Sequence, residues 1–454
     1  MTEQPRHPDG TARPHRPGWP PLLKRWHSTR LSRFLRILGP GVITGAADDD
    51  PSGIATHSQA GAQFGLGMAW TMLLTLPLMT AVQEACARIG AVKGKGLAAV
   101  IRDRYSRRVL IPLVWLMVVA NTINIGANIA AIAAATRLLL PWVPIAALSI
   151  AFVAAILVFE VYTSYRIYAR VLKWLVLALL AYPVTAFVVG QPWGELLRAT
   201  VVPRAEFTYE YLFILTGIFG TTISPYLFFW QASEVVEEEL ERHEGPAGGD
   251  HRPVSARFLR QIRVDNAIGM CFANLAAWFI IVTCASVLFE HGVRNIATAE
   301  DAARALEPLV NTFPHAGFLA KAIFAVGIIG LGLLAIPTLA GSAAYGLAET
   351  YGWREGLSLR FRHAHGFYGV MVIATLVGLA LPLTGVDPMR ALVVAGVVNG
   401  VVAVPLLLCL ALLARDPVVM GPHRSGRLSS ALVWTTFAVM AASGAMLLAS
   451  VVLT

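Results

Sequence analysis

Three consecutive aspartates, Asp48, Asp49 and Asp50, lie inside an otherwise apolar stretch and are followed at once by Pro51 and, two residues later, by Gly53. Carboxylate oxygens are ligands for hard cations, but a carboxylate near the centre of a bilayer costs roughly 2.5–3.5 kcal/mol. Pro51 and Gly53 also weaken helical hydrogen bonds where lipid offers no replacement. Such a segment is tolerated only where it lines a cavity enclosed by protein. The pattern predicts a broken membrane helix whose charged break binds a cation in a transporter.

The composition is that of an integral membrane protein. Of the 454 residues, 56% are hydrophobic and 14% are charged, and the mean hydropathy is +0.63, whereas soluble domains carry about 25% charged residues. Apolar stretches of roughly the 20 residues that cross the hydrocarbon core predict an all-α protein with eleven transmembrane helices. The predicted spans are 37–66, 68–90, 109–136, 143–161, 170–190, 209–239, 264–289, 315–348, 366–383, 388–413 and 430–453.

Basic residues are distributed unequally between the predicted loops. The formal net charge is +9, but 29 of the 36 Lys and Arg residues fall on one side of the predicted membrane. Positively charged loops face the cytoplasm, so we expect the N-terminus there, the C-terminus outside, and a multi-pass protein of a bacterial inner membrane. This placement argues against nucleic acid as a partner. Residues 1–36 are basic and lack an apolar run, which predicts a flexible cytoplasmic tail.

A second interruption falls in the sixth predicted span, where two glycines, a Thr pair and Pro225 break a long hydrophobic run. A single Pro or Gly is often only a kink. Breaks in spans one and six, however, are expected when two five-helix units repeat with inverted topology, as in LeuT-like transporters. The repeats would be residues 37–190 and 209–413, and residues 430–454 would form an additional eleventh helix. Substrate would bind between the two breaks.

The residues around the first break resemble a known family. The break reads DPSG at residues 50–53 and is followed by QAGAQFG at residues 59–65. Both stretches resemble the first helix of the Nramp family of divalent-metal transporters, which has Asp-Pro-Gly-Asn at its break. The ARIG of residues 87–90 resembles the family's second helix, and residues 217–233 resemble its sixth, where the usual break reads Met-Pro-His. The resemblance implies a divalent metal cation as the substrate.

The site that this resemblance implies departs from the family pattern. Asp50 matches the family's metal-binding Asp, and Thr221 and Ala47 supply backbone carbonyls that face the ion. Gly53 stands where the family has Asn, and Ser224 stands where it has the Met sulfur. Loss of the thioether removes the ligand that favours transition metals, whereas Mg²⁺ usually keeps several waters beside one or two carboxylates. The sequence is therefore most similar to the Nramp-related magnesium-transporter branch.

The resemblance also bears on proton coupling. Proton transport in the family is associated with an Asp-x-x-Glu in the third helix and with the His of the sixth. Here the third helix carries Asn121, Asn124 and Asn128, and Tyr226 replaces the His. A proton relay needs groups that titrate in a useful range, and an asparagine side chain does not, so proton coupling by the usual route is not expected. We expect the three asparagines to form hydrogen bonds between helices, with Asn124 and Tyr226 beside the site rather than among the ion's ligands.

Three further side chains are expected around the site. Asp48 and Asp49 would widen a negatively charged vestibule, because neighbouring residues on a helix point about 100° apart. His57 lies seven residues beyond Asp50 and therefore near the same helix face. A structural hydrogen bond from His57 to another span is expected, with ion binding and proton transfer as the alternatives.

Glutamates outside these motifs have simpler interpretations. Glu84 lies one helical turn from Arg88, which predicts an ion pair. The glutamates at positions 234, 237–239 and 241 lie near the end of the sixth predicted span and are expected to form a solvated face.

These residues predict a secondary transporter that moves Mg²⁺, Mn²⁺ or both by alternating access. It would need no cofactor and no obligate protein partner, and it would lack Nramp-type proton coupling. The sequence has no P-loop, nucleophile elbow or HExxH motif, so an enzyme is not expected. The alternatives are a proton-coupled Mn²⁺/Fe²⁺ symporter and an organic-solute carrier of the same fold, whose anionic substrate the aspartates would repel. An ion channel would instead need an open pore.

Overall fold

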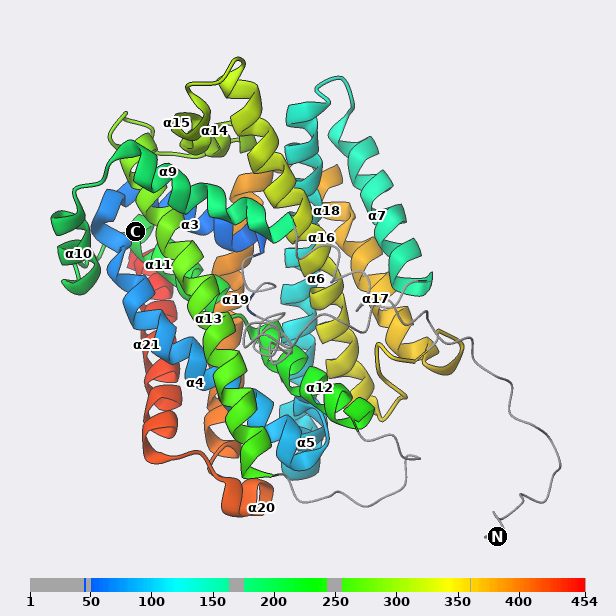
Figure 1. Cartoon of the computed structure of the whole chain (residues 1–454). Helices are drawn as coiled ribbons and strands as arrows, with labels where there is room; N and C mark the ends of the chain where they lie inside the picture. Colours follow the sequence, from blue (N-terminus) through cyan, green and yellow to red (C-terminus); the bar gives the residue numbers. More distant parts are fainter. Residues whose placement is uncertain (1–44, 46–49, 163–174, 243–254, 360, 454) are drawn as a thin grey trace, which may run out of the picture. The chain divides into compact units, whose positions relative to one another are not determined.

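The computed structural model describes residue 45 and residues 50–162, 175–242, 255–359 and 361–453. Within these ranges every regular element is a helix, so the predicted all-α fold is confirmed (Figure 1). The predicted tail, residues 1–36, lies outside the described residues, and that prediction is untested.

A helix begins at the predicted first break. Asp50 is extended (φ −69°, ψ 166°), and α3 (Pro51–Phe64) starts directly after it. Gly65 ends α3 with φ 57°, a left-handed conformation that glycine adopts without steric penalty. The 3₁₀ helix η2 (Gly65–Met68) then leads to α4 (Trp70–Lys93). The helical segment Pro51–Met68 and α4 are bent by 109° relative to each other.

Most of the other predicted spans coincide with long apolar helices. Seven helical segments in the described part are long and apolar enough to cross a bilayer, and the bent α3–α4 pair raises this number to as many as eight. The seven are α6 (Arg107–Leu139), α11–α12 (Tyr209–Thr222 and Pro225–Arg242), α13 (Ala256–Cys284) with its π-helical extension, α16 (Ala316–Tyr351), α17–α18 (His365–Gly378 and Ala380–Leu383), α19 (Pro388–Leu413) and α21 (Arg427–Leu453). The fourth and fifth predicted spans hold the shorter apolar helices α7 (Ile145–Tyr162) and α9 (Ala181–Val189). A count of eleven spans therefore stays a prediction.

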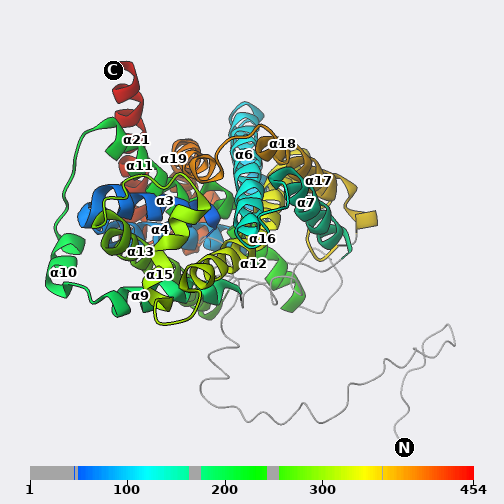
Figure 2. The ribbon, with the colours of Figure 1, turned by 90° about the horizontal axis from the view of Figure 1, so that it is seen from above.

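The long helices pack around the two breaks. α16 lies along α6 and α17, α11 lies along α19, and α3 contacts α11, α13 and α19. Seen from above, α6, α7, α16 and α17 lie together on one side, while α3 lies beside α13 (Figure 2). α6 joins the two groups because it also packs against α19. The described part also contains short α-helices, namely α5 (Leu97–Arg104), α10 (Trp193–Val201), α14 (Ala299–Ala303), α15 (Glu307–Val310) and α20 (Pro417–Met420), and short 3₁₀ helices such as η3 (Leu175–Leu180).

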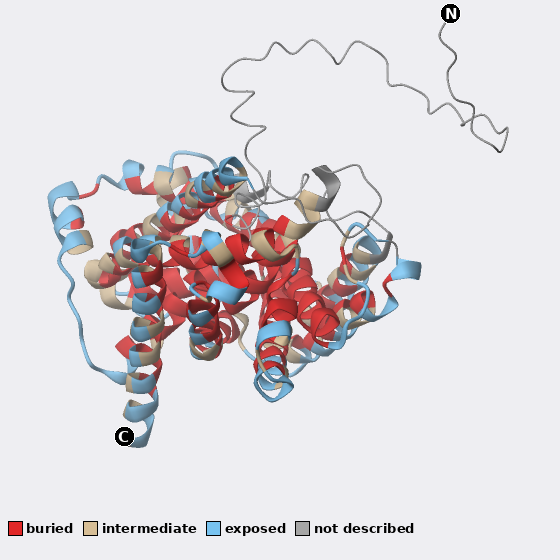
Figure 3. Ribbon diagram, turned by 90° about the horizontal axis from the view of Figure 1, so that it is seen from below, coloured by how far each residue is buried: buried red, intermediate tan, exposed pale blue. Residues whose placement is uncertain are grey.

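Burial is greatest where the breaks lie. Every residue from Pro51 to Ala62 in α3 is buried. Every residue from Leu227 to Ser233 in α12 is buried as well, and intermediate exposure begins at Glu234. Figure 3 shows the buried residues concentrated on the central helices and many exposed residues on the helix that ends at the C-terminus. Polar groups on α3 therefore need partners inside the protein.

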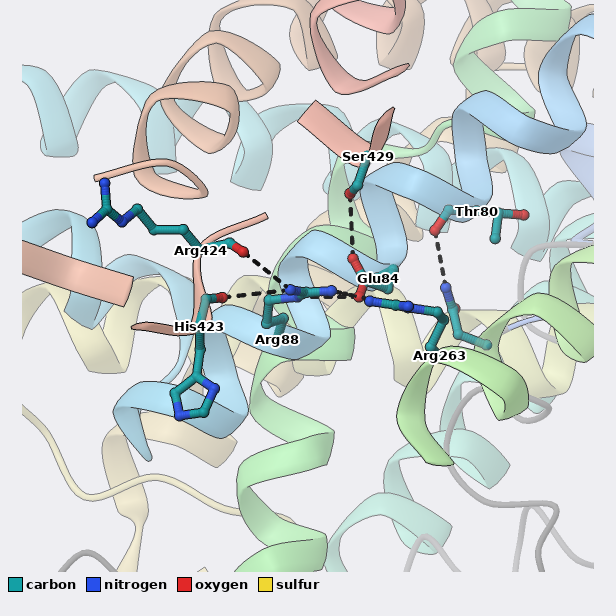
Figure 4. Close-up of polar contacts among 8 residues, drawn as sticks. Thr80, Glu84, Arg88, Arg263, His423, Arg424 and Ser429 are labelled. Carbon is teal, nitrogen blue, oxygen red and sulfur yellow. Dashed lines mark hydrogen bonds and ion pairs between the residues drawn. The ribbon is translucent and has the colours of Figure 1, made fainter. Parts of the chain in front are cut away.

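The predicted ion pair of Glu84 with Arg88 is confirmed and forms part of a larger clamp (Figure 4). Arg263 of α13 also donates to Glu84 (3.4 Å), and Arg88 donates to the carbonyls of His423 and Arg424 (both 3.4 Å). The clamp ties α4 to α13 and to the segment that precedes α21. Removing one partner from such a buried pair is strongly destabilising, so we assign it a structural role.

The expectation of a solvated glutamate face is wrong for Glu237. Its carboxylate accepts hydrogen bonds from the Tyr345 hydroxyl and from the Leu357 amide (2.7 Å), so it fastens α12 to the end of α16 and the following loop. Glu355 lies in that loop. Its burial, together with the charges of Glu349 and Glu237, raises the pKa of Glu355 to about 9.

Candidate cation-binding site

Asp50 caps the helix that follows the first break. Its Oδ1 accepts hydrogen bonds from the Gly53 amide (2.9 Å) and the Ser52 hydroxyl (2.5 Å). Pro51 occupies the first helical position, where a missing amide hydrogen has no consequence. A carboxylate is stabilised here because a helix N-terminus carries partial positive charge. Asp50 is only 2% exposed. Oδ1 is thus engaged by α3 itself, whereas Oδ2 faces another helix.

That helix is α6, which contributes Asn128. The Asn128 amide nitrogen lies 3.3 Å from Asp50 Oδ2 and also donates to Asn124 Oδ1 (3.0 Å) and the Asn124 carbonyl (2.9 Å). Asn121 donates to the Leu339 carbonyl of α16 (3.0 Å). The expected hydrogen bonds between helices are therefore confirmed for Asn121 and Asn128, whereas Asn124 pairs with Asn128 inside α6.

The second break separates α11 from α12 at residues 223 and 224. The Thr221 hydroxyl donates back to the carbonyls of Gly217 (3.1 Å) and Ile218 (3.2 Å). The Ser224 hydroxyl donates to the carbonyls of Gly220 (3.0 Å) and Thr221 (2.8 Å), which the break leaves without helical partners. Each carbonyl keeps a second lone pair, so the end of α11 presents neutral oxygens at the negative end of its helix dipole.

Small residues bring the two broken helices into direct contact. A Cβ atom at Gly217 of α11 would lie 3.2 Å from the Thr56 methyl group of α3. A Cβ atom at Gly220 would lie 2.0 Å from the Gly396 carbonyl of α19, a distance that only glycine permits. The helix interfaces that surround both breaks therefore depend on close backbone approach, as is common between membrane helices.

Two residues predicted to lie beside the site take part in other contacts. Tyr226 is buried at the start of α12, and its carbonyl accepts a hydrogen bond from Ser342 of α16 (2.6 Å). His57 was expected to bond to another span, and this expectation is wrong: its Nδ1 donates to the Gly53 carbonyl of its own helix (2.6 Å). Residues four apart on a helix lie on one face, which explains that contact. His57 Nε2 is buried and has no hydrogen-bond partner among the described residues.

The remaining predicted residues divide into placed and unplaced groups. Ala47, Asp48 and Asp49 lie outside the described residues, so their roles as carbonyl ligand and vestibule stay predictions. Gly53 is buried, and both its amide and its carbonyl are bonded, to Asp50 and His57. It therefore supports the carboxylate, and it offers no side-chain ligand.

Asn124 was expected beside the site; it is hydrogen-bonded to Asn128, and Asn128 is the α6 residue that contacts Asp50. The spacing of positions 121, 124 and 128 puts all three asparagines on one helix face, and that pattern does not reveal which of them reaches the break. The glycines of α19 that accommodate α11 were also missed, because a glycine in an apolar span has no distinctive sequence context.

In chemical terms, the described site offers one carboxylate and several neutral groups. No group of three or more His, Cys, Asp or Glu side chains in the described part of the chain could hold a metal ion. The charge of a bound cation would be met by Asp50, by backbone carbonyls at the end of α11 and by amide or hydroxyl oxygens. Such a set suits a cation that retains part of its hydration shell.

Comparison with known proteins supports the interpretation of the breaks. Residues 41–450 match the family described as natural resistance-associated macrophage protein-like, or Nramp. The chain is 26% identical over 430 residues to a divalent metal cation transporter MntH of Ralstonia nicotianae, covering 93% of this chain and 91% of that protein. It is 27% identical over 378 residues to an MntH of Klebsiella pneumoniae (strain 342), covering 82% and 84%.

Solved structures share the fold. A manganese transporter of Eremococcus coleocola superposes with a TM-score of 0.71 at 18% identity and covers 92% of this chain and 87% of its own. The nucleobase-cation-symport-1 family transporter Mhp1, in a closed conformation, gives a TM-score of 0.56 at 14% identity and covers 92% and 90%. These likenesses support the predicted LeuT-like arrangement with broken first and sixth helices. Because the family match spans nearly the whole sequence, this chain belongs to the Nramp family.

Proposed function

We propose that this protein is a secondary transporter that moves divalent metal cations, Mg²⁺ and Mn²⁺, by alternating access, with Asp50 as the principal ligand. The observation that carries the proposal is the buried carboxylate of Asp50 at a helix break: among the described residues, α3 holds its Oδ1, and the Asn128 amide of α6 lies next to its Oδ2. The names of the relatives, divalent metal cation transporter and manganese transporter, support a divalent substrate.

The choice of a hard ion rests on the ligand types. Ser224 offers a hydroxyl where a sulfur would favour a transition metal, and its oxygen lies 2.8 Å from the Thr221 carbonyl. A methionine does lie on α6, at Met117, but its sulfur accepts a hydrogen bond from Asn121 (3.2 Å). Met117 precedes Asn128 by eleven residues, about 16 Å along a helix axis, which is too far for a shared ion.

The absence of Nramp-type proton coupling is also part of the proposal. Asp50 contacts Ser52, Gly53 and Asn128, and none of these groups titrates. The membrane potential alone can drive a divalent cation inward, with about 4.6 kcal/mol per 100 mV for two charges. We therefore infer uptake without stoichiometric proton entry.

Proton-coupled symport of Mn²⁺ or Fe²⁺ is the second candidate, and His57 is the observation that favours it. His57 is 4% exposed, lies two helical turns beyond Asp50 and keeps one ring nitrogen without a partner among the described residues. A histidine in such a position can accept and release a proton.

We place the protein in a bacterial inner membrane with its N-terminus in the cytoplasm, since most basic residues lie in loops on that side.

Competitive uptake into proteoliposomes tests the proposal. Wild-type protein is expected to accumulate Mg²⁺ and Mn²⁺, with each ion inhibiting uptake of the other, and Ca²⁺ serves as a further competitor. Asp416→Asn is a matched control, because Asp416 also caps a helix, accepting a hydrogen bond from the Val418 amide (2.8 Å), and lies outside the breaks. Mn²⁺ uptake that millimolar Mg²⁺ does not inhibit would contradict the proposed ion class.

A further inference from the structure

The amide of Asn128 is surrounded by more hydrogen-bond acceptors than it can satisfy. Its nitrogen carries two hydrogens but lies within 3.3 Å of three oxygens, namely both oxygens of Asn124 and Asp50 Oδ2. These three acceptors fix the orientation of the amide, because the reverse orientation would place Oδ1 against them. The contact with Asp50 is the longest of the three. Asp50 Oδ2 is therefore held in position but only weakly engaged.

In the same orientation, Asn128 Oδ1 has no hydrogen-bond donor among the described residues. Asn128 is 0% exposed, and its Oδ1 has no hydrogen-bond partner among the described residues. A buried oxygen without a hydrogen-bond donor destabilises the folded protein unless a ligand or water supplies that donor. Asn124 Nδ2 is likewise buried and without a partner in the described part. One turn of α6 thus presents an unused acceptor and an unused donor beside the carboxylate.

We propose that Asn128 determines ion specificity by accepting, through Oδ1, a hydrogen bond from a water molecule of the bound ion's hydration shell, while its amide nitrogen positions Asp50. This inference rests on the proposed function and names a further residue for it. Water bound to a cation points its hydrogens outward, so a partly hydrated ion needs acceptors around it. Mg²⁺, which dehydrates reluctantly, benefits from such an acceptor more than Mn²⁺ does.

The geometry favours a water bridge over direct coordination. The oxygen and nitrogen of one amide are about 2.2 Å apart, and the nitrogen lies 3.3 Å from Asp50 Oδ2. The two oxygens are therefore separated by at most about 5.5 Å. Two oxygens that bind one Mg²⁺ at about 2.1 Å are at most about 4.2 Å apart. If a water molecule lies between the ion and Oδ1, any separation of the two oxygens up to about 5.5 Å is possible. Direct binding of the ion by both oxygens requires a separation of at most about 4.2 Å.

The test compares half-saturation concentrations for Mg²⁺ and Mn²⁺ uptake in proteoliposomes made with the full chain. Asn128→Leu, which removes donor and acceptor at similar volume, is expected to raise the Mg²⁺ value at least tenfold and the Mn²⁺ value less than threefold. Asn128→Ser keeps an oxygen and is expected to recover part of the lost preference. Asn121→Leu is the control, because Asn121 is equally buried on α6 but bonds to the Leu339 carbonyl. In this variant the ratio of the half-saturation concentrations for Mg²⁺ and Mn²⁺ should equal that of the wild type.

Equal shifts for the two ions in Asn128→Leu would overturn the inference and leave Asn128 as a structural residue. If Asn128→Leu does not reconstitute, Asn128→Ala is measured in the same way, and an unchanged ratio there has the same meaning. Failure of the wild-type protein to transport any divalent cation would instead refute the proposed function. A wild type that transports Mg²⁺, with variants that leave the ion ratio unchanged, would refute only the role of Asn128.

Discussion

Asp50→Asn separates the two roles of this side chain. As a helix cap, asparagine is about as good as aspartate, and its oxygen can still accept from the Gly53 amide that now lies 2.9 Å from Asp50 Oδ1. The bond from Ser52 loses its charge assistance, which reduces its contribution by roughly 1 kcal/mol. We therefore expect the variant to fold and to remain monodisperse in detergent, with a melting temperature only a few degrees below that of the wild type.

Ion binding should respond far more strongly. The variant removes the one carboxylate of the described site, and removing one partner of a buried ionic pair costs about 3–5 kcal/mol. This range corresponds to roughly a 150-fold to 5,000-fold loss of affinity. Titration calorimetry with Mg²⁺ in detergent and uptake into proteoliposomes measure it, with Asp416→Asn as the control for loss of a capping carboxylate elsewhere.

Two results would contradict these roles of Asp50. Half-saturation by Mg²⁺ or Mn²⁺ within threefold of the wild-type value in Asp50→Asn would remove Asp50 from the site. A variant that neither folds nor reconstitutes would mean that the capping role dominates, contrary to the near-equivalence of asparagine and aspartate as caps.

Other substitutions test the ion preference, the helix packing and the pH dependence separately. Restoring the family's side chains with Gly53→Asn and Ser224→Met together should raise the preference for Mn²⁺ over Mg²⁺ in competition uptake, because it adds an oxygen and a soft sulfur. Gly220→Ala should lower the melting temperature strongly, since its Cβ would lie 2.0 Å from a carbonyl of α19, whereas Gly369→Ala, with nothing within 4 Å, should be neutral or slightly stabilising. Glu355 has a pKa raised to about 9 in the folded protein, so the folded state holds this proton more tightly than the unfolded state. The free energy of unfolding should therefore fall as pH rises from about 4.5 to about 9, and Glu355→Gln should weaken this dependence in thermal melts.

The breaks themselves could be predicted from the sequence because their signals are local. A carboxylate next to Pro and Gly in an apolar run has one tolerable environment in a membrane, and Asp50 indeed begins α3 in a buried position. The interruption at Ser224 and Pro225 likewise separates two helices. Ser224 capping the Thr221 carbonyl follows from the same local chemistry.

The contacts between helices could not be predicted in the same way. Asn128 and Asn124 share a helix face, so only the packing of α6 on α3 decides that Asn128 reaches Asp50. Glu237 belongs to a charged run that is usually solvated, yet a loop more than 100 residues later supplies its amide partner. His57 bonds to a carbonyl one turn back in its own helix, a contact that periodicity alone does not reveal.

This site is proposed to carry a hard divalent cation without a proton. Simultaneous recording of luminal Mg²⁺ and luminal pH tests this directly, in proteoliposomes that hold a negative-inside potential and no pH gradient. We predict saturable Mg²⁺ entry that Asp50→Asn abolishes, with the luminal pH unchanged. Absence of Mg²⁺ entry while Mn²⁺ accumulates, or acidification that follows Mg²⁺ entry and disappears in Asp50→Asn, would contradict it.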